Sequence, residues 1–194
     1  MVTVLILDID GSIAEYPEDA IKLFRERDPK VCSGCPDLTL ENKCIRRSRC
    51  EKEGVNIKSK IDEIFTPERV IGFKPIKKAQ ELIFRAKWSG KDTLVYYVSG
   101  RPGNLIFASQ QWLMDHRFPV GLIALLGDQP GDPGENKVAF VKKILDSADE
   151  KTKKELTLMF IEDDVRVIKL YEGLGGINLM GEKNDNQGNC GAGC

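Results

Sequence analysis

The sequence predicts an α/β fold in which a parallel β-sheet carries helices on both faces. Short apolar, β-branched runs recur along the chain, and stretches with helical spacing of apolar residues separate them. Strands that alternate with helices form a parallel sheet with right-handed crossovers, which place helices on both faces. A chain of 194 residues is long enough to bury a sizeable core around such a sheet.

Four runs are predicted as buried strands, because each is apolar and too short to be a typical helix. They are residues 2–7, 93–98, 120–126 and 156–161, and residues 177–180 are a candidate fifth strand. The predicted helices between them have these apolar positions: Ile76, Ala79, Ile83 and Ala86 after Pro75; Leu105, Ala108, Trp112 and Leu113; Val138, Val141, Ile144 and Leu145. A short helix over residues 165–171 follows the fourth strand.

The composition is that of a globular protein, with 41% hydrophobic and 30% charged residues. A formal net charge of −1 argues against a purely electrostatic nucleic-acid binder. The longest apolar runs are too short to span a bilayer, so no membrane association is expected. The N-terminal residues lack the pattern of a signal peptide, and we expect a cytoplasmic protein.

The chain divides into a core and an insertion. Residues 1–14 and 67–180 carry the alternation of strands and helices and form the predicted catalytic core. Residues 15–66 are charged and rich in cysteine, and we expect them to form a small cap. Residues 181–194 are rich in glycine and asparagine, which is typical of a flexible tail.

Two acidic residues follow the first predicted strand directly. Asp8 and Asp10 are two positions apart, a spacing that puts both side chains on the same side of the sheet edge. One carboxylate of such a pair can attack phosphorus and the other can move protons. The alternative is an ordinary turn after a strand.

Two further segments could hold a phosphoryl group. Ser99, Gly100 and Arg101 end the second predicted strand, where a hydroxyl and free N–H groups can bind phosphoryl oxygens. Lys137 begins a helix, an unfavourable place for a cation unless it neutralises a phosphate. The alternatives are a serine N-cap and a surface lysine.

Three consecutive acids, Glu162, Asp163 and Asp164, follow the fourth strand. Like charges so close together repel one another, so a cation is expected beside them. Several carboxylate oxygens suit Mg²⁺. The alternative is a solvated acidic turn.

The ordered motifs resemble the haloacid dehalogenase superfamily of phosphotransferases. The motifs of that family are an apolar strand with DxDx[ST], a strand ending in Ser or Thr, a Lys, and a strand ending in paired acids. The resemblance implies that Asp8 is the nucleophile and that Asp10 is the general acid and base of a phosphatase. It also implies that Ser99 and Lys137 hold the phosphoryl group, with Gly100 and Arg101 beside them.

The same resemblance implies a magnesium site. The Asp8 carboxylate, the Asp10 backbone carbonyl and Asp163 would bind Mg²⁺. Asp164 would be their acidic partner, and Glu162 could exchange roles with it.

A closer resemblance is to the phosphatase domain of phage-type polynucleotide kinase/phosphatases. It depends on residues 98–102, 111–113, 127–128 and Lys137. Those enzymes remove a 3′-phosphate from nucleic-acid ends. The sequence has no Walker A motif, so it predicts no kinase activity.

Four clustered cysteines in the predicted cap indicate a metal site. Cys32, Cys35, Cys44 and Cys50 supply four thiolates, which favour a structural Zn²⁺ in a short segment. An iron–sulfur cluster, free thiols or disulfides are the alternatives. The sequence does not decide the role of Cys190 and Cys194 in the tail.

The predicted cap is also basic, with seven Lys and Arg against three Glu over residues 41–60. Such a surface could attract a phosphorylated polyanion. We therefore expect a Mg²⁺-dependent phosphatase acting on phosphorylated nucleic-acid ends or nucleotides. A small-metabolite phosphatase and a nucleic-acid-binding module with a secondary phosphatase core are the alternatives. The sequence leaves the oligomeric state open.

Overall fold

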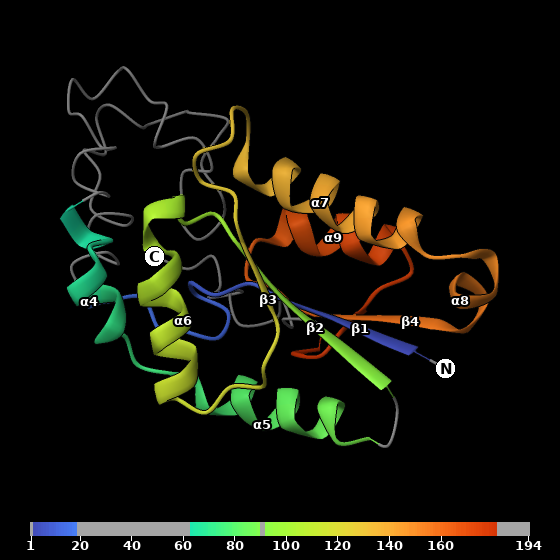
Figure 1. Cartoon of the computed structure of the whole chain (residues 1–194), viewed down its shortest axis with the longest axis horizontal. Coiled ribbons are helices and arrows are strands. Elements are labelled where there is room, and N and C mark those ends of the chain that lie inside the picture. Colours follow the sequence, from blue (N-terminus) through green and yellow to red (C-terminus); the bar gives the residue numbers. More distant parts are fainter. Residues whose placement is uncertain (1, 19–62, 90–91, 182–194) are drawn as a thin grey trace, which may run out of the picture.

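A computed structural model describes residues 2–18, 63–89 and 92–181, and these contain a five-stranded parallel sheet (Figure 1). The strands run in the order β3-β2-β1-β4-β5, so β1 lies at the centre. Their bounds are β1 (Val2–Leu7), β2 (Asp92–Ser99), β3 (Leu122–Leu125), β4 (Leu156–Ile161) and β5 (Ile177–Asn178). The predicted parallel α/β fold is confirmed.

The register of the sheet aligns the carboxyl ends of its three central strands. Leu7, the last residue of β1, pairs with Tyr97 of β2 and with Ile161 of β4. The segments that follow these strands therefore leave the sheet at the same edge. Ligands of open parallel sheets bind beyond this edge, so it is where a site is expected.

The helices lie on both faces of the sheet. In Figure 1, α7 and α9 lie on one side of the strands and α5 lies on the other. The described helices are α4 (Pro67–Ile71), α5 (Lys77–Lys87), the 3-10 helix η3 (Gly103–Leu105), α6 (Ile106–Asp115), α7 (Pro133–Ser147), α8 (Glu150–Glu155) and α9 (Val165–Gly173).

The alternation of side chains along β1 creates two hydrophobic cores. Leu5 and Leu7 belong to a core with the buried residues of α5 and α6. Val4 and Ile6 belong to a core with the buried residues of α7 and α9. Successive strand residues point to opposite faces, so a continuous apolar strand supplies both layers.

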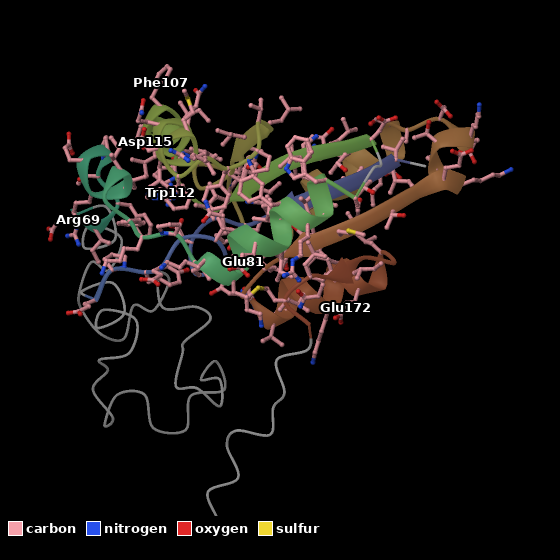
Figure 2. The ribbon with its side chains drawn as sticks, turned by 90° about the horizontal axis from the view of Figure 1, so that it is seen from below. Arg69, Glu81, Phe107, Trp112, Asp115 and Glu172 are labelled. Atoms are coloured by element: carbon pink, nitrogen blue, oxygen red, sulfur yellow. The ribbon has the colours of Figure 1, made fainter. Side chains whose placement is uncertain are left out.

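Helix α6 shows how an amphipathic pattern fixes one face of a helix. Trp112 is fully buried and donates its indole N–H to the carbonyl oxygen of Phe73 at 2.7 Å. Phe107 is exposed, and Figure 2 shows both residues labelled on this helix. The buried face of α6 therefore ties the helix to the segment after α4.

The structure differs from the sequence prediction at the edges of the sheet. The third strand covers only Leu122–Leu125, and Val120 is 96% exposed. Within the described residues, β3 is an edge strand that pairs with β2 alone, and proteins commonly keep edge strands short. The sequence analysis did not predict α4 or α8; α8 buries no residue, so it leaves no apolar pattern.

Several predictions lie outside the described residues. Residues 19–62 hold most of the predicted cap, with its four cysteines and its basic residues. Residues 182–194 hold the other two cysteines. The domain boundaries and the metal at the cysteines stay predictions. In the described part of the chain, no helix has the length and apolar character to cross a membrane.

Candidate active site

The loop after β1 carries two carboxylates and folds back into the core. Ile9 and Ile13 are fully buried, and the Ile13 N–H donates to the Ile9 carbonyl oxygen at 3.0 Å. The Asp8 N–H donates to the Ile161 carbonyl oxygen of β4, also at 3.0 Å. A loop anchored in this way holds the side chains of Asp8 and Asp10 in place.

Gly11 is required at the turn of this loop. Its φ of +79° lies in the left-handed region, which favours glycine. A Cβ at this position would collide with the Asp163 carboxylate and with the Tyr16 ring. Glycine therefore lets the loop approach the acidic end of β4 and the first residues after the loop.

A buried lysine links the ends of β1 and β4. The Lys137 Nζ of α7 lies 2.7 Å from Asp8 Oδ1 and 3.0 Å from Glu162 Oε2. All three residues are buried, and Asp8 is 5% exposed. We call Asp8, Lys137 and Glu162 the lysine group.

Burial dominates the electrostatics of the lysine group. Burial and the charge of Glu162 raise the pKa of Asp8 to about 8, although Lys137 partly opposes them. Burial also raises the pKa of Glu162. Burial alone would lower the pKa of Lys137, but the two carboxylates raise it above its usual value, so the lysine remains charged.

A metal ion fits the acidic end of this site. One carboxylate oxygen from each of Asp8, Glu162 and Asp163 lies within 4.8 Å of the others. Ser12 Oγ is 3.2 Å from Asp8 Oδ2 and 3.4 Å from Asp163 Oδ1, and so bridges two of them. Oxygen-only donors of this kind suit Mg²⁺.

An arginine binds the second carboxylate of the loop. Arg101 Nε and Nη2 donate to the two oxygens of Asp10 at 2.8 and 2.6 Å. Its Nη1 donates to Ser109 Oγ of α6 at 2.8 Å, and its guanidinium lies 5.6 Å from the centre of the Phe73 ring. We call Asp10, Arg101 and Ser109 the arginine group.

The segment after β2 is held from two sides. Ser99 is buried, and its Oγ accepts the Arg101 N–H at 3.2 Å. The Gly127 N–H donates to the Arg101 carbonyl oxygen at 2.9 Å, and a Cβ on Gly127 would collide with this backbone. Gly100 lies close to Pro133 at the start of α7. The backbone of residues 99–101 therefore has a fixed position at the sheet edge.

Asp164 lies apart from the lysine group. It is the N-cap of α9, where its Oδ1 accepts the Arg166 N–H at 2.9 Å. Its other oxygen pairs with Arg166 Nη2 at 2.7 Å. Glu162 instead lies beside Asp8, and its Oε1 accepts the N–H groups of Asp163 and Asp164 at 3.1 Å each.

The sequence analysis named most of the residues that meet at this edge. The structure brings together Asp8, Lys137, Glu162 and Asp163, and it brings Arg101 onto Asp10. Ser109 was missed because it lies on the apolar stripe of a helix. A serine among the apolar positions of a predicted helix is a signal that could have found it. Such a serine is expected to be buried, and a buried hydroxyl has a hydrogen-bond partner.

Tyr16 was also missed. Its pKa is well above the usual value, because burial and the nearby charges of Asp163, Asp10, Asp8 and Glu162 disfavour the phenolate. The hydroxyl therefore stays protonated among these carboxylates. It lies only five residues after Gly11, and no spacing rule marks it in the sequence.

Comparison with solved structures finds two low similarities. The HAD domain of effector protein Lem4 from Legionella pneumophila is 16% identical, with a TM-score of 0.43 over 91% of this chain and 85% of that chain. A HAD family hydrolase from Deinococcus radiodurans R1, solved with bound phosphate and sodium, is 9% identical, with a TM-score of 0.41 over 90% of this chain and 89% of that chain. No curated protein matches the sequence.

A family match covers more than half of the chain. Residues 59–172 match the family described as PITM 1-3, LNS2 domain. The matched residues include Ser99, Lys137 and Glu162, and they begin after Asp8 and Asp10. This match supports the predicted haloacid dehalogenase superfamily and a phosphatase. The resemblance to polynucleotide phosphatases stays a prediction. The chain belongs to the LNS2 domain family.

Proposed function

We propose that this chain is a Mg²⁺-dependent phosphomonoester hydrolase that forms an aspartyl-phosphate on Asp8. One observation carries the proposal. The buried Asp8 carboxylate lies 2.7 Å from Lys137 Nζ and within 4.8 Å of carboxylate oxygens of Glu162 and Asp163, at the carboxyl edge of the sheet. Phosphoryl transfer requires a positioned nucleophile and concentrated positive charge, and this site has the means for both.

In the first step, an Asp8 oxygen attacks phosphorus and the bond to the leaving oxygen breaks. Asp10 must carry a proton at this step, on an oxygen lone pair that the Arg101 hydrogen bonds leave free. It gives this proton to the leaving oxygen, so the alcohol leaves neutral. Lys137 neutralises charge on the phosphoryl oxygens. The Ser99 oxygen already accepts the Arg101 N–H, so its O–H can donate to the phosphoryl group.

In the second step, Asp10 takes a proton from water, and the water oxygen attacks the phosphorus of the aspartyl-phosphate. The bond to the Asp8 oxygen breaks, phosphate leaves, and Asp10 is protonated again. Bound Mg²⁺ supplies positive charge against the phosphoryl oxygens. Asp8, Asp163 and the Asp10 backbone carbonyl would hold it, with Glu162 as their acidic neighbour.

The proposed substrate is a phosphorylated nucleic-acid end or a nucleotide. The basic residues 41–60 and the resemblance to polynucleotide phosphatases support this choice. A cap that seals the site would exclude a polymer and favour small metabolites instead.

The test is phosphate release with Mg²⁺ from a 3′-phosphorylated oligonucleotide, a nucleoside monophosphate and an aryl phosphate. Asp8→Asn is the inactive variant, and Asp146→Asn on the exposed surface of α7 is its matched control. We expect turnover that Asp8→Asn abolishes and Asp146→Asn keeps. Preference for the oligonucleotide or the nucleoside monophosphate supports the substrate class, and preference for the aryl phosphate overturns it. No release from any substrate contradicts the phosphatase itself.

A further inference from the structure

We propose that Arg101 is a positioning residue that holds the Asp10 carboxylate for proton transfer, and that it does not bind the phosphoryl group. The inference depends on the proposed function, because Asp10 moves protons only in that reaction. It assigns Arg101 a task different from the one its position after β2 first indicates.

The first argument is that the guanidinium fork is already occupied. Nε and Nη2 of Arg101 each donate to one oxygen of Asp10, and Nη1 donates to Ser109 Oγ. Bidentate arginine–carboxylate pairs are strong and fix the plane of the carboxylate. A phosphoryl group could recruit this fork only by breaking the pair with Asp10.

The second argument is burial. The side chain of Arg101 is 1% exposed and that of Asp10 is 13% exposed, so the open end of the pair is the carboxylate. The guanidinium lies over the Phe73 ring, and Ser109 closes it from α6. An arginine that reaches for a ligand needs the opposite arrangement, with the cation at the open end.

The third argument is that this support comes from the folded core. Ser109 is fully buried on the same helix as Trp112, which is bonded to the Phe73 carbonyl oxygen. The Arg101 carbonyl oxygen is held by the Gly127 N–H. Precise catalytic groups need neighbours that are locked by packing and hydrogen bonds, and Arg101 has both.

Orientation of Asp10 matters most when the leaving group is poor. An alkoxide needs a proton as its bond breaks, whereas an aryl oxide with electron-withdrawing groups leaves without one. The value of kcat/KM reports the steps up to transfer of the phosphoryl group to Asp8. A misplaced Asp10 therefore lowers kcat/KM for an alkyl phosphate more than for 4-nitrophenyl phosphate.

The experiment measures kcat/KM on these two substrates, with Mg²⁺, for wild type, Arg101→Met, Arg101→Lys and Ser109→Ala. We expect both Arg101 variants to lose about 100-fold on the alkyl phosphate and only a few-fold on the aryl phosphate. The inhibition constant of inorganic phosphate should stay within about twofold, because binding of the phosphoryl group is unchanged. In the Asp10→Asn background, Arg101→Met should have no further effect.

Ser109→Ala keeps the two hydrogen bonds from Arg101 to Asp10 and removes the hydrogen bond from Arg101 to Ser109. We expect the same preference for the aryl phosphate with a smaller loss, together with an unfolding midpoint near that of wild type. This variant keeps the test valid if the Arg101 variants do not fold.

Three outcomes overturn the inference. These are an equal loss on both substrates with a raised phosphate inhibition constant, full activity of Arg101→Lys, and additive losses in the Asp10→Asn background. If the Asp8→Asn variant turned over substrate as fast as wild type, this would instead overturn the proposed function. The Asp8→Asn variant thus separates the two failures.

Discussion

Two groups of ion pairs flank the loop after β1, and they are built differently. In the lysine group, one cation is shared by two buried carboxylates, Asp8 and Glu162. In the arginine group, one cation binds one carboxylate through two hydrogen bonds. With all members ionised, the first group has more negative than positive charge and the second is balanced.

This difference matches the two tasks that we propose for the site. A nucleophile that accepts a phosphoryl group benefits from a point charge and from room for a second cation, and lysine supplies a point charge. A proton-transfer group benefits from a fixed orientation, and the planar fork of arginine supplies it. The two cations are therefore not interchangeable.

Lys137→Met should have the largest effect, because it removes the cation from two buried carboxylates. We expect loss of turnover and a decrease of about 3 kcal/mol in the free energy of unfolding, since breaking a buried pair leaves charge without a partner. Urea unfolding near pH 9 without Mg²⁺, above the pKa of about 8 for Asp8, measures this decrease. Arg101→Met should cost less stability, because Asp10 keeps some access to water.

The matched control is the double variant Lys137→Met with Asp8→Asn. Removing one of the two unpartnered charges should restore part of the lost stability. Equal stability of Lys137→Met and wild type would show that the lysine group contributes nothing to the fold.

The second prediction separates two adjacent acids at the end of β4. Asp163→Asn should raise the Mg²⁺ concentration for half-maximal activity at least about tenfold, because Asp163 is one of the proposed ligands. Asp164→Asn should change it little, because asparagine is also a good N-cap and Asp164 lies outside the group of three acids. A larger effect of Asp164→Asn would place the metal on the other side of Glu162.

The sequence predicts the order and the type of the main elements, because apolar residues recur at regular spacing along the strands and helices that form the two cores. It also predicts that Asp8, Ser99 and Glu162 reach one edge, because parallel strands align their carboxyl ends. It does not predict which cation binds which carboxylate. Lys137 and Arg101 both suit a phosphate by position, and only the hydrogen bonds from Arg101 to Asp10 and Ser109 show that its guanidinium is occupied.

The sequence also leaves open whether Glu162 or Asp164 is the acidic partner of the proposed metal site. Three consecutive acids are equivalent as a pattern. The structure separates them because the backbone turns into α9, so that Asp164 becomes its N-cap while Glu162 stays buried against Lys137. The path of the backbone after β4 therefore decides which of these acids faces Lys137.

The third prediction concerns how the stability of the protein changes with pH, and its test needs no measurement of activity. In the metal-free protein, burial raises the pKa of Asp8 from 3.8 to about 8, so between these values the folded chain holds a proton that the unfolded chain has released. The contribution of this group to the free energy of unfolding therefore falls as the pH rises through this range.

If Mg²⁺ binds to Asp8 as we propose, it must displace that proton. The increase in unfolding midpoint on adding Mg²⁺ should therefore be about 3 °C larger near pH 8.5 than near pH 5.5. Calorimetry of wild type, Asp8→Asn and Asp10→Asn measures it. Asp8→Asn should lose the difference. Asp10→Asn should keep it, because Asp10 offers only its backbone carbonyl, and a loss in that variant would contradict the assignment.

The smallest effect is expected at a third ion pair, which is close to the site but exposed. Arg166 pairs with Asp164 at 2.7 Å and with Asp132 at 3.5 Å, and so joins the N-caps of α9 and α7. Its side chain is 42% exposed, and pairs of this kind contribute less than about 1 kcal/mol. Arg166→Ala should therefore leave kcat/KM unchanged and lower the free energy of unfolding by less than about 1 kcal/mol, as measured by urea unfolding. High salt should reduce even this decrease, because exposed charges are screened and the buried lysine and arginine groups are not. A loss of activity in this variant would mean that the positions of the helix starts, and not only the two buried cations, control the site.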